Sequence, residues 1–233
     1  MEYLNICKGN FIERPNRFVA EVLIGGEVQR AHVKNTGRCR ELLVPGAQVY
    51  LEDFTERMGD RKMQYSLIGV KKGDMLVNMD SQAPNVAVKE ALESGALIPP
   101  GMGSLTLIKG EQVYGDSRLD FYIEDESGQS AFVEVKGVTL EEDGVAKFPD
   151  APTQRGVKHI RELIKAADNG YKAYALFLIQ MKGPHCFTPH DAMHKEFGNA
   201  VREAHKAGVT LLAYDCLVTE NTMTLSEEVE TKL

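Results

Sequence analysis

The pattern of apolar residues changes near residues 81–84, and this change most limits what the chain can fold into. Before it, apolar residues recur at every second position, as in Phe18, Ala20, Val22 and Ile24, and glycine-marked turns separate such runs. Alternation of this kind places one face of a strand in a core. No amphipathic helix is evident in this part, so the sequence predicts a small all-β barrel or sandwich.

The remainder of the chain has the pattern of an α/β domain, in which helical periodicity alternates with strand-like runs. The run at 173–179 is continuously apolar, as is typical of a strand covered on both faces. The last helix is expected to begin at Thr188, with Pro189 at its first position. The expected helices span 85–94, 153–169 and 188–207, and the expected strands span 104–109, 116–124, 131–136, 171–180 and 209–218. We therefore divide the chain into domains of residues 1–82 and 83–233.

The distribution of charge limits the possible partners. The chain has 27 Lys and Arg against 34 Asp and Glu, a net charge of −7, whereas proteins that only coat nucleic acid are usually strongly basic. The first domain is nearly neutral, with 12 basic and 11 acidic residues, and the second has 15 and 23. Arg30, Lys34, Arg38 and Arg40 gather in the first domain. They form either a solvated loop or a stripe that contacts phosphates locally.

Targeting features and cysteine content predict a cytoplasmic protein. No apolar run approaches the ~18–20 residues of a membrane helix, and the N-terminus lacks the basic and apolar regions of a signal peptide. Cys7, Cys39, Cys186 and Cys216 are widely spaced, so we expect reduced thiols rather than a disulfide framework.

Two carboxylates are expected to face each other across a hairpin. Residues 126–129 have the composition of a turn, and a hairpin centred there places Asp120 opposite Glu134, with Cβ atoms roughly 4.5–5.5 Å apart. Strict alternation places Lys136 on the same face as this pair. It places residues 119, 121 and 123 together on the opposite face.

Opposed carboxylates repel each other unless a positive charge compensates them. Mg²⁺ or Mn²⁺ would do so, because such ions bind one or two carboxylates and take waters or phosphate oxygens as further ligands. Lys136 could then stabilise charge on a phosphate, so Asp120, Glu134 and Lys136 are the candidate catalytic residues for phosphodiester hydrolysis. The alternative is an exposed strand face on which Lys136 and Arg118 neutralise the acids.

Several motifs spread over nearly the whole chain carry a family resemblance. They are Asn35-Thr36-Gly37-Arg38, Glu41-Leu42-Leu43, Ser117-Arg118-Leu119-Asp120-Phe121, Glu134-Val135-Lys136-Gly137-Val138-Thr139 and Phe148-Pro149-Asp150-Ala151-Pro152-Thr153. Together they resemble the sugar fermentation stimulation protein A family. The resemblance implies an N-terminal OB-fold and a C-terminal α/β domain of the PD-(D/E)XK nuclease type. It also implies sequence-nonspecific DNA binding and a regulatory role in sugar utilisation.

The resemblance also assigns roles to individual residues. Asp120 matches the acid of the second core strand, Glu134 and Lys136 match the E-x-K motif, and Glu90 matches an additional acid on the preceding helix. The candidate metal ligands are therefore Asp120, Glu134 and Glu90. Leu119 stands where the superfamily pattern has proline.

The candidate nucleic-acid contacts combine the basic stripe with residues near the acidic pair. On the helix expected at 153–169, His159 is either a proton-transfer group or, as we expect, a half-exposed residue. The candidate contacts are Lys34, Arg38, Arg40, Arg118, Arg155 and Lys158.

Three functions remain open at this stage. The favoured one is a DNA-binding protein that retains a divalent-metal site, and the main alternative is a nuclease acting on DNA or RNA, single strands included. A small-molecule hydrolase with a similar metal site is the third. His190 and His194 form a separate pattern resembling the zinc motif H-E-x-x-H, but Asp191 replaces its glutamate and is also explained as an acid at a helix N-terminus.

Overall fold

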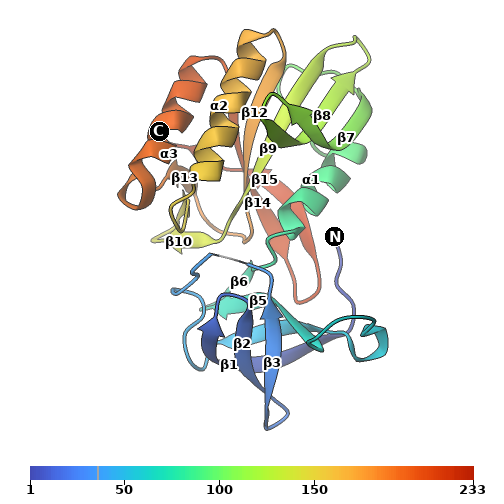
Figure 1. Ribbon diagram of the computed structural model, residues 1–233, viewed down its shortest axis with the longest axis vertical. Coiled ribbons are helices and arrows are strands. Elements are labelled where there is room, and N and C mark those ends of the chain that lie inside the picture. The colour runs from blue at the N-terminus through green and yellow to red at the C-terminus, as the bar shows by residue number, and fades with distance from the viewer. Residues whose placement is uncertain (36) are drawn as a thin grey trace.

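The computed structural model describes residues 1–35 and 37–233, which form two lobes (Figure 1). Thr36, which belongs to one of the family motifs, lies outside the described residues. The N-terminal lobe consists of strands, and the C-terminal lobe layers helices on a sheet. In the part of the chain that the structure describes, no helix is long and apolar enough to cross a membrane.

Five strands of the N-terminal lobe close into a barrel, which confirms the predicted OB-fold. The elements are β1 (Ile6–Asn16), β2 (Val19–Ile24), β3 (Glu27–Val33), β4 (Gln48–Asp53), the 3₁₀-helix η1 (Thr55–Arg57), β5 (Tyr65–Lys72) and β6 (Met75–Asn78). The strand order is β3-β2-β1-β4-β5-β6, and a parallel pairing of β3 with β5, with Ala31 opposite Tyr65, closes the barrel. Ala20 and Val22 are fully buried, as their alternation predicts.

The C-terminal lobe is built on a six-stranded mixed sheet. Its strands are β7 (Leu105–Tyr114), β8 (Ser117–Asp125), β9 (Ser130–Val138), β12 (Lys172–Ile179), β14 (Thr210–Val218) and β15 (Met223–Glu228), and its helices are α1 (Ala83–Glu93), α2 (Gln154–Asp168) and α3 (Asp191–Lys206). The strand order is β15-β14-β12-β9-β8-β7, and β12 runs parallel to both β9 and β14. This arrangement confirms the predicted α/β domain.

The two faces of this sheet have separate cores. Phe121 and Val133 pack with Leu92 of α1 on one face. Phe132 and Phe177 belong to the core that also contains apolar residues of α2 and α3, which lie side by side on the other face (Figure 1). Both faces of β9 are therefore buried, so a polar residue on this strand is desolvated unless it lies at the end of the strand.

A second, smaller sheet was not expected from the sequence. It consists of β10 (Leu140–Glu142), β11 (Val145–Phe148), β13 (Cys186–Pro189) and β16 (Glu230–Thr231), in the order β10-β11-β13-β16. The expected helix start at Thr188 and Pro189 was wrong, because both residues pair with β11 and α3 begins at Asp191.

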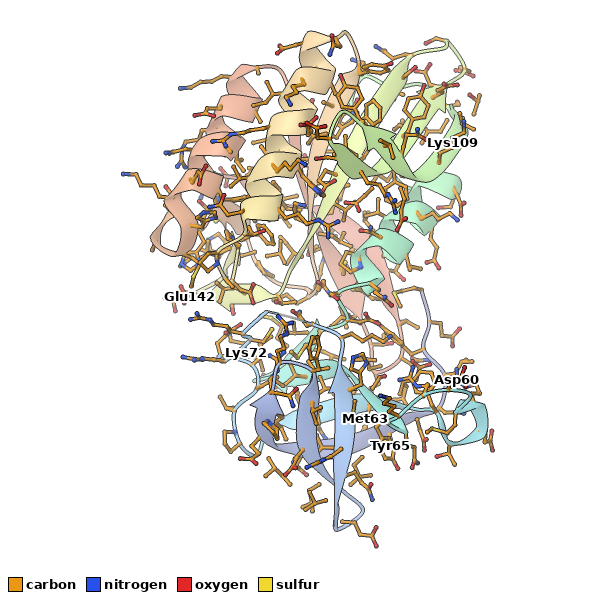
Figure 2. All side chains as sticks on the ribbon, in the orientation of Figure 1. Asp60, Met63, Tyr65, Lys72, Lys109 and Glu142 are labelled. Carbon is orange, nitrogen blue, oxygen red and sulfur yellow. The ribbon has the colours of Figure 1, made fainter. Side chains whose placement is uncertain are left out.

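The two lobes meet at a polar junction. Lys72 at the end of β5 lies 2.5 Å from the carboxylate of Glu141, and Figure 2 shows Lys72 and Glu142 on opposite sides of this junction. Gly37 approaches Asp150 so closely that an added Cβ would lie 2.1 Å from a carboxylate oxygen. The barrel loop that contains Gly37 therefore fits tightly against the segment before α2.

The hairpin of β8 and β9 has the register that the sequence predicts. The antiparallel pairing ends with Phe121 opposite Val133. This is one pair short of Asp120 and Glu134, so the two carboxylates lie where the strands stop sharing ladder hydrogen bonds.

Asp125 holds the turn of this hairpin. Its Oδ1 accepts hydrogen bonds from the backbone nitrogens of Ser127 at 2.9 Å and Gln129 at 3.0 Å, and its Oδ2 accepts one from the backbone nitrogen of Gly103 at 2.8 Å. Hydrogen bonds from the Gly103 backbone and the Ser127 hydroxyl lower the pKa of Asp125 from 3.8 to about 2. The ionised carboxylate thus fixes the turn that sets the register.

We predict that Asp125→Asn destabilises the protein in a pH-dependent way. Since the pKa of Asp125 is lower in the folded state, its ionised form contributes stability above about pH 4, and this contribution disappears as the pH falls towards about 2. The difference in unfolding free energy between wild type and variant should therefore shrink over that interval. Urea denaturation at a series of pH values measures it, and a constant difference would contradict the assigned role.

Candidate functional site

Asp120 is held between β9 and the first turn of α1. Its Oδ2 accepts a hydrogen bond from the backbone nitrogen of Val135 at 2.8 Å, and its Oδ1 accepts one from Nδ2 of Asn85 at 2.8 Å. The Val135 N–H lies just beyond the last β8–β9 pair. The Asp120 carboxylate therefore accepts the hydrogen bond that a backbone carbonyl of β8 would otherwise accept. This bond holds the carboxylate beside Glu134.

Glu134 is buried, with 2% of its surface exposed. Its Oε1 contacts both the Lys136 ammonium and Nδ1 of His159. Arg155 Nε donates to His159 Nε2 at 3.3 Å, so the ring proton is assigned to Nδ1, which donates to Glu134. The second oxygen, Oε2, is buried without a hydrogen-bond partner among the described residues.

The two carboxylates differ in their protonation equilibria. Burial and the neighbouring Glu134 charge raise the pKa of Asp120, against the influence of Lys136. Burial also acts to raise the pKa of Glu134, but the Lys136 charge and the His159 hydrogen bond hold that pKa below its usual range. Glu134 is thus the ionised member of the pair, and further positive charge would favour ionisation of Asp120.

The expectation of strict alternation along β8 was wrong at this point. Leu119 packs in the core that contains α2, whereas Phe121 and Ile123 pack in the core that contains α1. Asp120 correspondingly bonds to α1 through Asn85, while Glu134 bonds to α2. The carboxylates are neighbours because the ladder opens between them.

The donor set suits a hard divalent cation with few protein ligands. Within residues 1–35 and 37–233, no three His, Cys, Asp or Glu side chains form a group that could enclose a metal ion. Mg²⁺ does not need such an enclosure, because it commonly binds one or two carboxylates and retains waters. The unpartnered Oε2 of Glu134, beside Asp120, is the buried oxygen that a cation would satisfy.

Glu90 is not brought to this pair. Its carboxylate Oε2 lies 2.6 Å from the N-terminal ammonium of Met1. The α1 residue that contacts Asp120 is Asn85, which sequence reasoning missed. In the sequence, Asn85 is recognisable only as a polar residue directly after Pro84. Polar residues in the first turn of a helix are often solvated, so this position alone does not indicate a contact with Asp120.

His159 was expected to be half-exposed and is instead 7% exposed. The sequence placed it on a polar stripe of α2, next to Arg155. That stripe turns towards Glu134 because α2 packs over β9, a contact that helical periodicity alone does not reveal.

Four of the six candidate nucleic-acid contacts already have protein partners. The contacts are Lys34 Nζ with Asp80 Oδ2 at 2.6 Å, Arg118 Nη1 with Glu111 Oε2 at 3.1 Å, Lys158 Nζ with the backbone oxygen of Asp116 at 2.6 Å, and Arg155 Nε with His159 Nε2 at 3.3 Å. Lys34 is also largely buried, with 19% of its side chain exposed, so its first role is to bind Asp80.

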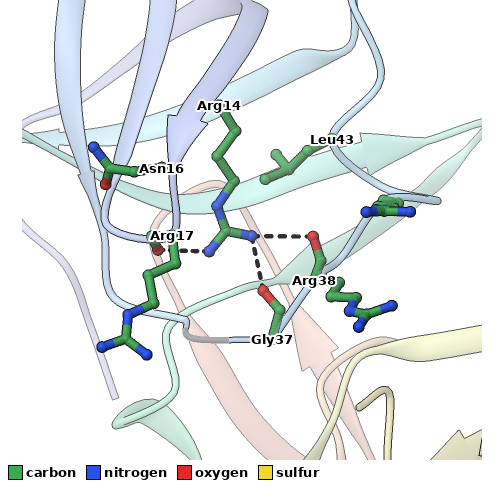
Figure 3. Close-up of a pocket in the computed structure, with 7 residues that line it drawn as sticks. Arg14, Asn16, Arg17, Gly37, Arg38 and Leu43 are labelled. Carbon is green, nitrogen blue, oxygen red and sulfur yellow. Dashed lines mark hydrogen bonds between the residues drawn. The ribbon is translucent and has the colours of Figure 1, made fainter.

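Arg38 and Arg40 differ from these four. Both are exposed, and neither forms an ion pair with any residue that the structure describes. They line a cavity on the barrel together with Arg14 and Arg17 (Figure 3).

The zinc pattern at His190 and His194 does not form a site of the H-E-x-x-H type. His194 has φ −153° and ψ 85°, so it lies at a kink and not on a regular helical face with His190. Asp191 bonds to Arg202 at 2.8 Å, in keeping with a structural acid in the first turn.

The closed barrel and the α/β domain with its Asp120, Glu134 and Lys136 cluster define a two-domain protein of OB barrel and α/β sheet. Two family models match it: the "SfsA N-terminal OB domain" at residues 12–79 and the "Sugar fermentation stimulation protein RE domain" at residues 82–222. The chain therefore belongs to the sugar fermentation stimulation protein (SfsA) family.

Individual relatives match over the full length. A sugar fermentation stimulation protein homolog of Desulfitobacterium hafniense is 53% identical over 100% of this chain and 99% of its own. One from Ruminiclostridium cellulolyticum is 49% identical over 100% of both. A solved structure of Pyrococcus furiosus SfsA in complex with Ca²⁺ superposes with a TM-score of 0.89, at 30% identity over 100% of this chain and 98% of that one.

We predict that His159→Ala destabilises the protein by about 2–4 kcal/mol, because it removes a donor from a buried carboxylate that already has one unpartnered oxygen. His205→Ala, at an exposed position near the end of α3, is the matched control and should change stability by at most about 0.5 kcal/mol. Urea denaturation of the metal-free protein measures both. If both variants changed the unfolding free energy by the same small amount, the contact between His159 and Glu134 would not stabilise the protein.

Proposed function

We propose that this protein binds DNA and holds a divalent cation, Mg²⁺ or Mn²⁺, between Asp120 and Glu134. The observation that carries the proposal is the buried carboxylate pair. Glu134 Oε2 has no partner in the part of the chain that the structure describes, and burial beside Glu134 raises the pKa of Asp120. A pair that repels in this way is stabilised by a cation that both oxygens can bind. A role in sugar utilisation, which the family name suggests, would act through this binding.

Asp120 and Glu134 would hold the cation, and when bound it would neutralise phosphate charge. Asn85 and Val135 orient Asp120 by hydrogen bonds, so this ligand is positioned in advance. His159 and Lys136 do the same for Glu134. The P. furiosus relative, similar over the whole chain, was solved in complex with Ca²⁺, which supports divalent-cation binding here.

The nucleic-acid side of the proposal rests on Arg38 and Arg40. Their guanidinium groups are exposed and not ion-paired among the described residues, so binding phosphate would not require breaking an existing pair. Arg155, in the first turn of α2, lies near the acidic pair through its contact with His159, and Lys158 follows three residues further along the same helix. They would extend the contacts towards the metal centre.

Hydrolysis of the bound strand is the second candidate function. Lys136 favours it, because its ammonium contacts Glu134 and could stabilise negative charge that develops on a phosphate at the same place. His159 positions Glu134 by donating from Nδ1, and we assign it no proton-transfer step.

We predict that Mn²⁺ or Ca²⁺ binds the wild-type protein and that Asp120→Asn or Glu134→Gln weakens binding at least about tenfold, because each removes one of two charged ligands. Isothermal titration calorimetry of the metal-free proteins measures the affinity. Glu90→Gln is the control with the same chemical change, and its affinity should be unaltered since Glu90 pairs with Met1. Wild-type affinity in both Asp120→Asn and Glu134→Gln would overturn the assigned site.

We also predict that Arg38→Ala combined with Arg40→Ala weakens DNA binding and reduces its salt dependence. Two lost phosphate contacts should lower the slope of log K against log salt concentration by about 1.8 on duplex DNA and about 1.4 on single strands. Arg30→Ala is the control, because Arg30 pairs with Glu21 at 3.3 Å on the barrel. An unchanged slope would exclude the two arginines as phosphate contacts.

The same DNA and a matched RNA, incubated with Mg²⁺ or Mn²⁺ and separated under denaturing conditions, distinguish the two functions. Shortened strands that disappear in Asp120→Asn would establish a nuclease. Bound but intact strands would leave a binding protein.

A further inference from the structure

The cavity on the barrel is lined by an unusual concentration of positive charge. Its volume is about 380 Å³, and its lining contains no carboxylate. Figure 3 shows it between the end of β1 and the loop that follows β3. The lining residues are Arg14, Asn16, Arg17, Gly37, Arg38, Arg40 and Leu43. We call this cavity the arginine pocket.

Arg14 is the fixed element of the arginine pocket. Its Nη1 donates to the backbone oxygens of Gly37 at 2.8 Å and Arg38 at 3.0 Å. Its Nη2 donates to those of Arg17 and Asn35, both at 2.6 Å. The Arg14 guanidinium thus links the β1–β2 turn to the loop after β3. Its hydrogen-bond acceptors here are backbone carbonyl oxygens and not a carboxylate.

The charge of Arg14 is therefore not neutralised. Its Nε is buried and has no hydrogen-bond partner among the described residues. A buried donor without a partner is costly unless a ligand or water satisfies it, so this part of the pocket is incomplete without an acceptor.

The other three guanidinium groups remain available. Arg17, Arg38 and Arg40 are exposed, and none is ion-paired with a residue that the structure describes. Arg17 also stacks on Phe18, with its Cζ 4.6 Å from the ring centre, which limits its freedom near the pocket. Three adaptable donors thus surround a fixed one.

We propose that the arginine pocket binds a doubly charged phosphate group, the phosphomonoester at the end of a nucleic-acid strand. The proposal rests on the proposed DNA-binding function and adds recognition of a strand end to it. A phosphodiester brings a single negative charge and two free oxygens. A phosphomonoester brings about −1.5 to −2 and three strong acceptor oxygens, which better match four guanidinium groups.

The location of the pocket fits this role. Gly37 and Arg38 belong to the loop that is pressed against Asp150, directly before α2. The first turns of α2 carry Arg155, which contacts His159 and through it Glu134. A strand end held on the barrel would therefore lie beside the segment that leads into α2, the helix whose His159 contacts Glu134.

The test measures wild-type affinity for a short DNA oligonucleotide carrying a 5′-phosphate, a 3′-phosphate or only hydroxyl ends. We expect one phosphorylated form to bind at least about tenfold tighter than the hydroxyl form. A hydroxyl-ended oligonucleotide one nucleotide longer adds a single negative charge as a phosphodiester, and it should show no such gain. Fluorescence anisotropy at fixed salt gives the ratios.

Arg17→Ala should reduce the ratio of phosphorylated to hydroxyl affinity to about one, because it removes a donor without touching the carbonyl contacts of Arg14. Arg30→Ala, a barrel arginine outside the pocket, should keep the ratio. Equal binding of phosphorylated and hydroxyl ends by wild type would overturn the inference and leave DNA binding intact. A pocket that binds inorganic phosphate while all three oligonucleotides fail to bind would overturn both the strand end and the proposed function.

Discussion

The opening of the β8–β9 ladder beyond Phe121 and Val133 is the constraint on which the site depends. Two antiparallel strands normally satisfy each other's backbone groups. Here the Val135 N–H bonds instead to the Asp120 carboxylate. The other edge of β9 stays paired with β12 from Ala131 to Val138, and Glu134 on this strand is buried. The fold thus positions one carboxylate as a backbone acceptor and buries its neighbour.

Burying two carboxylates together is unfavourable, and the protein compensates only part of the cost. Lys136 and His159 both bond to the same oxygen of Glu134, and the other oxygen has no partner among the described residues. Asp120 receives neutral donors only, and its pKa is raised. A purely structural cluster would distribute its donors over all the oxygens. This uneven distribution supports the proposed cation site at Glu134 Oε2.

The fold could be predicted from the sequence because the alternation and turn patterns were local and strong. Alternation around Val22 indicated the barrel, and the turn composition of residues 126–129 predicted the β8–β9 register. The short sheet of β10, β11, β13 and β16 was missed because strands of two to four residues carry too few alternations to be recognised. Asn85 and the burial of His159 were missed for another reason: both depend on which helix packs over the open end of the hairpin, and a single helical period does not encode that contact.

The division of charge between the lobes explains how an acidic chain could bind a polyanion. Exposed charges more than about 8–10 Å apart are largely screened at physiological ionic strength, so a phosphate responds to nearby groups and not to the total of −7. Near the barrel loop those groups are arginines, whose approach to one another is enforced by the carbonyl contacts of Arg14. Near Glu134 the carboxylates would repel a phosphate, and a bound cation would remove that repulsion. Binding of a strand at the barrel would therefore require no metal, whereas its approach to the carboxylate pair would. Holding a strand and acting on it would thus be separate steps, and only the second would depend on the cation.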